Sequence, residues 1–215
     1  MLFTVSVSAQ QQTQAGAVVD DKAAPPQAQL FQLASSLVRY GYEAKEALPL
    51  IQALQIYKGM NVSQADDRTK TEEGVATSAR TKTDVLSYDE DQLIADATKF
   101  ANGDKTLLAL INDTKKSSRG AVGGPKRHVD AVNAGCTDVY RIQFRAGEPG
   151  WVYVSGDGDT DLDLYVYDAN GNFIDSDTDS TDECLCTFTP RWTGTFVIKI
   201  VNRGRVYNRY VITTN

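Results

Sequence analysis

A run of aspartates before and within one predicted strand is the densest group of reactive side chains in the sequence. The stretch reads GDGDTDLDLYVYD, and its acidic residues are Asp157, Asp159, Asp161, Asp163 and Asp168. Carboxylates held close together repel one another unless a cation neutralises them. Calcium accepts about six to eight oxygen ligands in a flexible geometry. The pattern therefore predicts a calcium site formed by these five aspartates.

The acidic run has two other possible interpretations, an EF-hand loop and a solvated sheet edge. An EF-hand loop needs glycine at its sixth position, but Leu162 occupies that position, so we exclude an EF-hand. The aspartates could instead form a solvated sheet edge that discourages aggregation. Such an edge could pair with the basic residues near the C-terminus, which are Arg191, Arg203, Arg205 and Arg209. The sequence leaves calcium binding and the solvated edge open.

Two tyrosines beside the aspartates are candidates for ligand recognition. Tyr165 and Tyr167 alternate with the apolar Leu164 and Val166, so a strand places the two rings on the face opposite the apolar one. Exposed rings on one face can form a binding platform for a carbohydrate or a peptide. Alternatively, the rings pack under a loop or a neighbouring strand.

Three cysteines and one histidine complete the inventory of reactive groups. In an exported protein, Cys136 is expected to form a disulfide with Cys184 or Cys186, which leaves one thiol over. A metal site made of two cysteines and His128 lacks a recognisable ligand spacing. We therefore expect His128 to be an exposed linker residue.

The charge distribution restricts the classes of partner. The net charge is −6, and residues 146–190 contain 11 acidic and no basic residues. Nucleic-acid binding needs a concentrated positive surface, so a nucleic-acid partner is not expected. The single histidine and the lack of a phosphate loop, a nucleophile elbow or an HExxH helix favour a protein that is not an enzyme. No apolar run approaches the roughly 20 residues needed to cross a bilayer.

Apolar periodicity in the first half of the chain predicts helices. Leu30, Leu33, Ala34, Leu37 and Val38 have the spacing of one buried helix face, with Gly41 as the C-terminal cap. We expect helices over about 27–40, 49–58, 87–102 and 104–116. Residues 61–86 lack a period and are predicted to form a mobile linker, and residues 117–129 a glycine-rich hinge. Residues 1–26 are interpreted as a signal-peptide remnant followed by a flexible leader; a first strand is the alternative for residues 1–9.

The second half of the chain alternates apolar and polar residues, which is typical of strands. Seven strands are expected, over about 140–144, 151–155, 162–167, 172–174, 184–189, 195–201 and 206–213. Asn170 and Gly171 predict a two-residue type I′ hairpin turn. The chain as a whole is therefore predicted to be α+β, with N-terminal helical hairpins joined by a flexible linker to an antiparallel β-sandwich of jelly-roll type over 130–215.

Two motifs in this region carry a family resemblance. The sequence DLDLYVYD at 161–168, with Asn170-Gly171 after it and TGTF at 193–196, resembles the bacterial pre-peptidase C-terminal domain over residues 130–215. The resemblance implies a β-sandwich similar in fold to collagen-binding domains, export from the cell and possible calcium binding. It also implies a role in attachment to a surface or substrate, or in maturation.

Together, the motifs predict a secreted or envelope-associated binding module that recognises an extracellular or envelope polymer or protein. Members of the resembled family usually follow a secreted peptidase, whereas here helices and a linker precede the domain and supply no catalytic residues. The alternative function is an accessory, targeting or maturation factor of a secreted peptidase, in which the helical region engages the partner.

Overall fold

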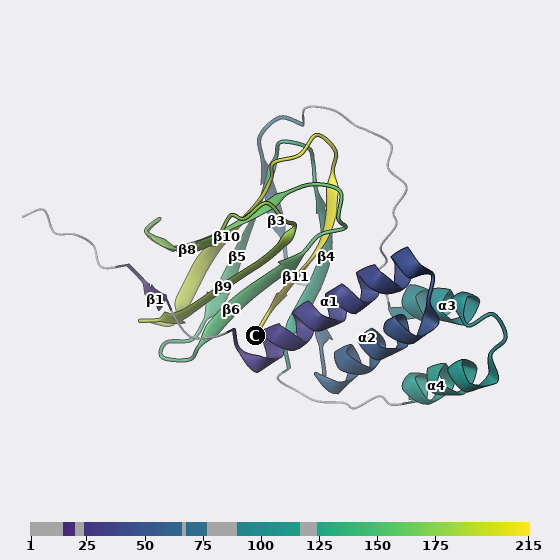
Figure 1. The fold of residues 1–215 in the computed structure, drawn as a ribbon. Helices are drawn as coiled ribbons and strands as arrows, with labels where there is room; N and C mark the ends of the chain where they lie inside the picture. The colour runs from purple at the N-terminus through teal and green to yellow at the C-terminus, as the bar shows by residue number, and fades with distance from the viewer. Residues whose placement is uncertain (1–14, 20–23, 66–67, 77–89, 117–123) are drawn as a thin grey trace, which may run out of the picture.

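The computed structural model describes residues 15–19, 24–65, 68–76, 90–116 and 124–215, in which it places four helices and eleven strands. The helices are α1 (Pro26–Ala44), α2 (Ala47–Gly59), α3 (Glu90–Phe100) and α4 (Lys105–Lys116). The N-terminal strands are β1 (Ala17–Val19), β2 (Ser63–Gln64) and β3 (Lys70–Glu73). The others are β4 (Lys126–Val132), β5 (Thr137–Phe144), β6 (Gly150–Ser155), β7 (Leu162–Asp168), β8 (Phe173–Asp177), β9 (Glu183–Pro190), β10 (Gly194–Asn202) and β11 (Asn208–Thr214). The predicted α+β class, with N-terminal helices and a strand-rich C-terminal part, is confirmed (Figure 1).

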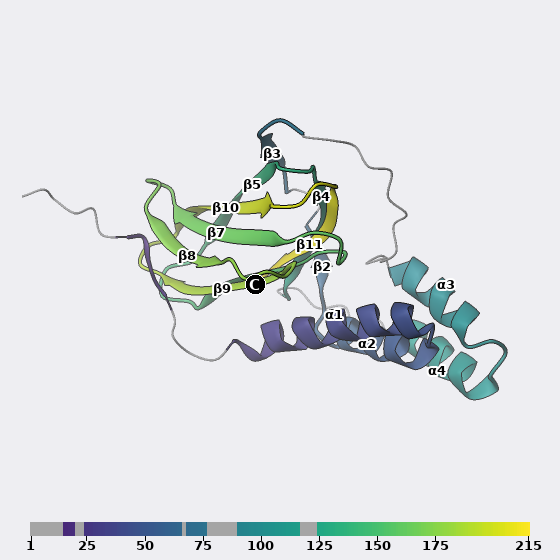
Figure 2. The same cartoon turned by 45° about the horizontal axis from the view of Figure 1, so that its top comes forward.

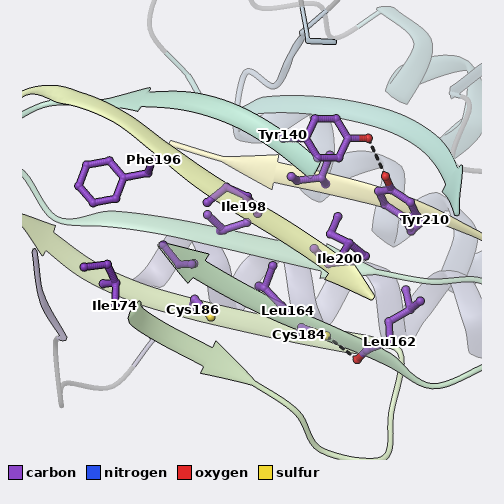
Figure 3. Packing of buried hydrophobic residues seen from close by; sticks show 14 of the residues in the cluster. Tyr140, Leu162, Leu164, Ile174, Cys184, Cys186, Phe196, Ile198, Ile200 and Tyr210 are labelled. Atoms are coloured by element: carbon purple, nitrogen blue, oxygen red, sulfur yellow. Dashed lines mark hydrogen bonds between the residues drawn. The ribbon is translucent and has the colours of Figure 1, made fainter. Parts of the chain in front are cut away.

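The strands form two sheets. One has six strands in the order β1-β9-β6-β11-β4-β2, and the other has five in the order β3-β5-β10-β7-β8. Neighbouring strands are antiparallel except β2 and β4, which are parallel. One hydrophobic cluster draws on both sheets, with Cys186 and Tyr210 from the first and Leu164 and Ile198 from the second (Figure 3). The finer prediction of a jelly-roll sandwich stays a prediction.

Helix α1 packs against the outer face of the six-stranded sheet, α2 packs against α1, and α3 and α4 pack against α2 (Figure 2). The ring of Phe31 on α1 lies 5.8 Å from that of Trp151 and 6.3 Å from that of Tyr153, both on β6. Val129 and Val211 face each other across β4 and β11 and belong to the hydrophobic cluster of the helices. No helix in the described part of the chain is long and apolar enough to cross a membrane.

The predicted buried face of α1 is wrong in part. Phe31, Ala34 and Val38 are buried, but Leu30 and Leu33 are 40% and 51% exposed. The helix carries two apolar stripes, and the one that contains Phe31 meets the aromatic side chains of β6. Sequence periodicity shows which residues form an apolar stripe on a helix. It does not show which of two stripes another element will cover.

Two helix ends show how local sequence sets the boundaries. The carboxylate of Asp104 accepts hydrogen bonds from the backbone N–H groups of Thr106 (2.8 Å) and Leu107 (3.1 Å), so Asp104 caps the N-terminus of α4. Gly41 does not end α1, which continues to a left-handed Lys45. A Cβ atom at Gly41 would lie 2.6 Å from Leu50 Cδ2, so the glycine permits the close approach of α1 and α2.

Several predicted loops contain strands. Residues 63–64 pair with β4 and residues 70–73 pair with β5, within the predicted linker 61–86. Residues 17–19 of the predicted leader pair with β9, and residues 126–129 of the predicted hinge begin β4. These segments are short or largely polar, so they carry a weak pattern of their own, and partners distant in the sequence hold them in place. The predicted signal remnant at 1–9, the predicted helix start at 87–89 and the hinge residues 117–123 lie outside the described residues.

The predicted type I′ turn is also wrong. A type I′ turn needs positive φ at both central residues, and only Gly171 has it, at +82°. The amide of Gly171 donates to the carbonyl oxygen of Asp168 at 3.1 Å. The Asp168 carboxylate accepts the amides of Asn170 and Asn172, each at 2.9 Å, and so stabilises a longer loop.

Candidate functional site

The outer face of the five-stranded sheet carries a row of rings and aliphatic side chains that we call the aromatic face: Tyr165, Tyr167, Phe173 and Val197. Tyr167 lies opposite Val197 of β10 and Phe173 of β8, and directly paired residues share one face of a sheet. The rings of Tyr167 and Phe173 are in edge contact at 5.9 Å. Phe173 is 54% exposed and the two tyrosines are half-buried. The predicted placement of Tyr165 and Tyr167 on one face is therefore observed.

Polar groups fix Tyr165 at one end of this face. Its hydroxyl donates to Asp163 Oδ2 at 3.1 Å and accepts from Arg203 Nη2 at 3.1 Å. Arg203 Nε also donates to Asp163 Oδ2 at 2.6 Å. The carboxylate of Asp163 is almost completely buried. This arrangement holds the tyrosine ring in one position and places a guanidinium group beside it.

The five aspartates predicted to bind calcium do not surround one point. Asp168 lies at the opposite end of β7 from Asp161 and Asp163. Burial alone would raise the pKa of Asp168, but hydrogen bonds from Asn172, Asn170 and Gly16 lower it. Asp168 is therefore an acceptor for backbone groups that organises the β7–β8 loop.

The other aspartates of the run differ in their surroundings. Asp157 is buried, and its Oδ2 accepts the amide of Arg209 at 2.8 Å, whereas Asp159 is exposed. Asp161 Oδ1 is buried without a hydrogen-bond partner. Burial raises the pKa of Asp161, and the charges of Asp163 and Asp179 raise it further. In the described ranges no group of three or more histidine, cysteine or acidic side chains is placed to hold a metal ion. Calcium binding stays a prediction.

The cysteines do not form the expected disulfide. Cys136, Cys184 and Cys186 are all buried free thiols. Cys184 and Cys186 project from the same side of β9 into the core, where Cys184 donates a hydrogen bond to the Leu162 carbonyl at 3.1 Å. Burial raises the pKa of all three thiols, so they behave as packed apolar groups rather than nucleophiles.

His128 is a strand residue rather than the exposed linker residue that we expected. It lies on β4 and is partly buried, with Nε2 3.5 Å from Asp130 Oδ2. Its ring meets the Tyr140 ring edge-on at 6.2 Å. His128 lies within the sheet because β4 pairs with β11, a strand that is far away in the sequence.

A buried polar cluster that was not predicted lies between the sheets and is formed by Lys70, Asp130, Asp138, Tyr140 and Tyr210. Lys70 Nζ lies 2.8 Å from an oxygen of Asp130 and 2.8 Å from an oxygen of Asp138. Tyr210 donates to Asp138 Oδ2 at 2.6 Å, and its hydroxyl oxygen lies 2.6 Å from that of Tyr140 (Figure 3). Residue type alone does not mark this cluster, because lysine and aspartate occur at many other positions of the chain. The pairing of β3 with β5 brings Lys70 beside Asp138.

The electrostatics of the buried polar cluster follow from its burial. Asp138 is fully buried, which raises its pKa, and the hydrogen bonds from Lys70 and Tyr210 oppose that rise. Burial would lower the pKa of Lys70, but hydrogen bonds to the two carboxylates raise it. Lys70 thus joins Asp130 on the six-stranded sheet to Asp138 on the five-stranded sheet. Its role is structural.

Comparison with known proteins identifies no family. No family model and no curated protein matches the chain. Among solved structures, a periplasmic inhibitor of g-type lysozyme from Salmonella Typhimurium aligns with 18% identity and a TM-score of 0.30, over 42% of this chain and 89% of that chain. Streptomyces albus HEPD, solved with 2-hydroxyethylphosphonate and Fe(II), aligns with 8% identity and a TM-score of 0.18, over 89% of this chain and 42% of that chain. Neither likeness is close enough to assign a fold or a function.

Proposed function

We propose that this protein is a non-catalytic, secreted or envelope-associated binding module, and that the aromatic face is its ligand-binding surface. One observation carries the proposal. Helix α1 packs over the outer face of the six-stranded sheet, whereas no helix in the described part of the chain packs over the outer face of the five-stranded sheet (Figures 1 and 2). Rings that share one face of a sheet and stay partly exposed there are typical of recognition surfaces.

The shape and chemistry of the face favour an extended polysaccharide as the ligand. The rings of Tyr167 and Phe173 lie on a sheet surface, which suits an extended chain better than a small molecule in a closed pocket. Tyrosine combines an apolar ring with a hydroxyl group, and sugars present apolar faces as well as hydroxyl groups. The Arg203 guanidinium beside Tyr165 offers hydrogen-bond donors to such hydroxyl groups.

The substitution Tyr167→Ala tests this surface. It removes the central ring of the aromatic face, and we expect it to weaken binding to an insoluble polysaccharide by about tenfold or more, because ring side chains dominate binding energies. Wild type and variant are compared in sedimentation assays with peptidoglycan, chitin and cellulose. Val75→Ala, at an apolar residue that is 84% exposed elsewhere, is the control and should leave binding unchanged. Equal binding by wild type and Tyr167→Ala, or binding only to a protein, would contradict the proposal.

We also propose that calcium stabilises the loop around Asp161. The buried Asp161 Oδ1 has no hydrogen-bond partner, and neighbouring carboxylates raise the pKa of this group, so a cation would relieve both conditions. At one hundred times its Kd, calcium should add about 2.7 kcal/mol of stability. For a chain of this size, that is a rise in Tm of about 5–10 °C.

Thermal unfolding in EDTA, calcium and magnesium measures this effect. Asp161→Asn should abolish the calcium-specific rise, while Asp113→Asn, at an exposed position on α4, should keep it. A wild-type Tm that is the same in calcium and in EDTA would contradict calcium binding and favour the interpretation of these aspartates as a solvated sheet edge.

A further inference from the structure

The pairing of the strands places basic side chains beside the aromatic face. Arg141 of β5 lies opposite Val197 of β10, and Val197 lies opposite Tyr167 of β7. In the next row, Lys199 of β10 lies opposite Tyr165. Directly paired residues share one face of a sheet, and neighbouring strands are about 4.8 Å apart. An arginine and a lysine therefore lie on the same surface as the rings, at most two strand spacings from them.

The three cations on this surface differ in how firmly the protein holds them. Arg203 is bound to the buried carboxylate of Asp163, which lies 2.6 Å from its Nε. Lys199 pairs with Glu73 at 2.9 Å, but this ion pair is exposed, and exposed pairs contribute little to stability. Arg141 is exposed, and its guanidinium group has no ion-pair or hydrogen-bond partner among the described residues. Arg141 and Lys199 are therefore available to pair with an anionic ligand.

The carboxylates of β8 lie on the opposite side of the sheet. Asp175 and Asp177 pair with core residues of β7, so they belong to the inner face. There, Asp177 Oδ2 accepts the amide of Leu185 at 2.9 Å, and Asp175 Oδ2 accepts that of Thr187 at 3.1 Å. The outer side of β8 carries Phe173 and a serine hydroxyl group instead. The negative charges of β8 are therefore directed away from the aromatic face.

The outer face of the five-stranded sheet is therefore cationic in an acidic protein. Its described residues include three cations and two carboxylates, whereas the whole chain has a net charge of −6. Complementary charge determines which partners a surface accepts. A local excess of positive charge beside exposed rings predicts a ligand that has both apolar surfaces and negative charge.

We propose that the ligand of the aromatic face is an acidic polysaccharide, whose carboxylate or sulfate groups pair with Arg141 and Lys199. Its sugar rings stack on Tyr167 and Phe173. The proposal rests on the binding surface proposed above and specifies the ligand of that surface. An arginine guanidinium group binds a carboxylate through two parallel hydrogen bonds, so it favours charged sugar units over neutral ones.

Two other kinds of polyanion fit this face less well. An extended acidic peptide needs partners for its backbone N–H and C=O groups, and a sheet offers such partners at an edge strand rather than on its face. A nucleic acid is bound through many phosphate contacts, whereas the described residues of this face offer two available cations. A polysaccharide needs neither, because its hydroxyl groups stay hydrated on an open surface.

Sedimentation with cellulose and chitin, each in its neutral form and with added carboxylate groups, tests the charge preference. EDTA in every sample removes divalent cations that would bridge a carboxylated polymer to the aspartates of the protein. At about 20 mM salt, we expect the wild type to bind the carboxylated forms about fivefold more tightly, because each exposed ion pair contributes a factor of about two to five. The preference should disappear at about 1 M salt, where the Debye length is only about 3 Å.

Substitutions of Arg141 test the residue assignment. Arg141→Gln should weaken binding to the carboxylated forms by a factor of about two to five and leave binding to the neutral forms unchanged. Arg141→Lys, which keeps the charge, should retain most of the preference. Lys105→Gln removes the same charge from an exposed position on α4 and should behave like the wild type. Both positions are exposed, so the three variants should keep the wild-type Tm.

The possible outcomes separate the ligand class from the binding surface. Equal binding of the neutral and carboxylated forms, with both lost in Tyr167→Ala, would overturn the acidic ligand and leave the proposed function standing. No binding to any of the four polymers would contradict this proposal together with the proposed function. Tighter binding to poly-L-glutamate than to the carboxylated polymers, or a full charge preference in Arg141→Gln, would also overturn the inference.

Discussion

Replacing Lys70 with methionine is expected to lower the free energy of unfolding by about 3–5 kcal/mol, because it removes one partner of a buried ion pair and leaves the other charged. Asp138 is fully buried, and its Oδ2 lies 2.8 Å from Lys70 Nζ. Without the ammonium group, Asp138 must either remain charged in the core or take up a proton. Urea unfolding at pH 7, followed by far-UV circular dichroism, measures the loss.

A second lysine provides the matched control. Lys199 on β10 makes an ion pair of similar length, 2.9 Å, with Glu73 on β3, but that pair is exposed. Lys199→Met should therefore cost less than about 1 kcal/mol. The double variant Lys70→Met/Asp138→Asn should recover part of the loss because it removes the unpaired charge. If Lys70→Met were no more destabilising than Lys199→Met, the buried polar cluster would not hold the two sheets together.

The protein is expected to lose stability steeply above pH 9. Burial raises the folded-state pKa values of Tyr140, Tyr153, Tyr210, Cys184 and Cys186. The unfolded chain therefore releases these protons at a lower pH than the folded chain. The stability that the five protonated groups contribute to the folded state is lost as the pH rises. Each group costs up to about 1.4 kcal/mol per pH unit above its unfolded pKa. Well above pH 10, where the unfolded chain has lost all five protons, these groups together give up to roughly 7 kcal/mol per pH unit, enough to unfold an ordinary domain.

Tyrosinate absorbance at 295 nm and circular dichroism, recorded on the same samples between pH 8 and 12, test the linkage. The buried tyrosines should ionise only together with the loss of structure. Tyr210→Phe should reduce the slope of stability against pH by about 1.4 kcal/mol per unit. Tyr40→Phe, at an exposed ring on α1, should leave the slope unchanged. Ionisation of every tyrosine while the circular dichroism remains native would refute the expectation.

The elements with a strong local pattern could be predicted from the sequence. The four helices and the seven strands after residue 136 lie close to their expected positions, because their apolar residues repeat at the period of the element. The four strands that were missed are β1, β2, β3 and β4: β1 has only three residues, and the other three contain mainly polar residues. Their structure depends on partners far away in the chain.

The candidate site was predictable only within a single strand. Alternation placed Tyr165 and Tyr167 on one face, but the register that brings Phe173 and Val197 beside them depends on pairing among three strands. The contact between Arg203 and Asp163 joins residues 40 positions apart. The prediction of a disulfide was wrong for the same reason, because spacing along the chain does not determine which side chains meet across a core.

The pairing of β1 with β9 has a consequence for biosynthesis. Ala17 lies opposite Pro190, and the amide of Gly16 reaches the carboxylate of Asp168 at 2.9 Å. A ribosome that adds about 5–20 residues per second needs on the order of 10–40 s to reach the partner of β1. The edge of β9 therefore has no β1 partner until β9 itself has been made, so residues 17–19 wait unpaired through the synthesis of more than 160 residues.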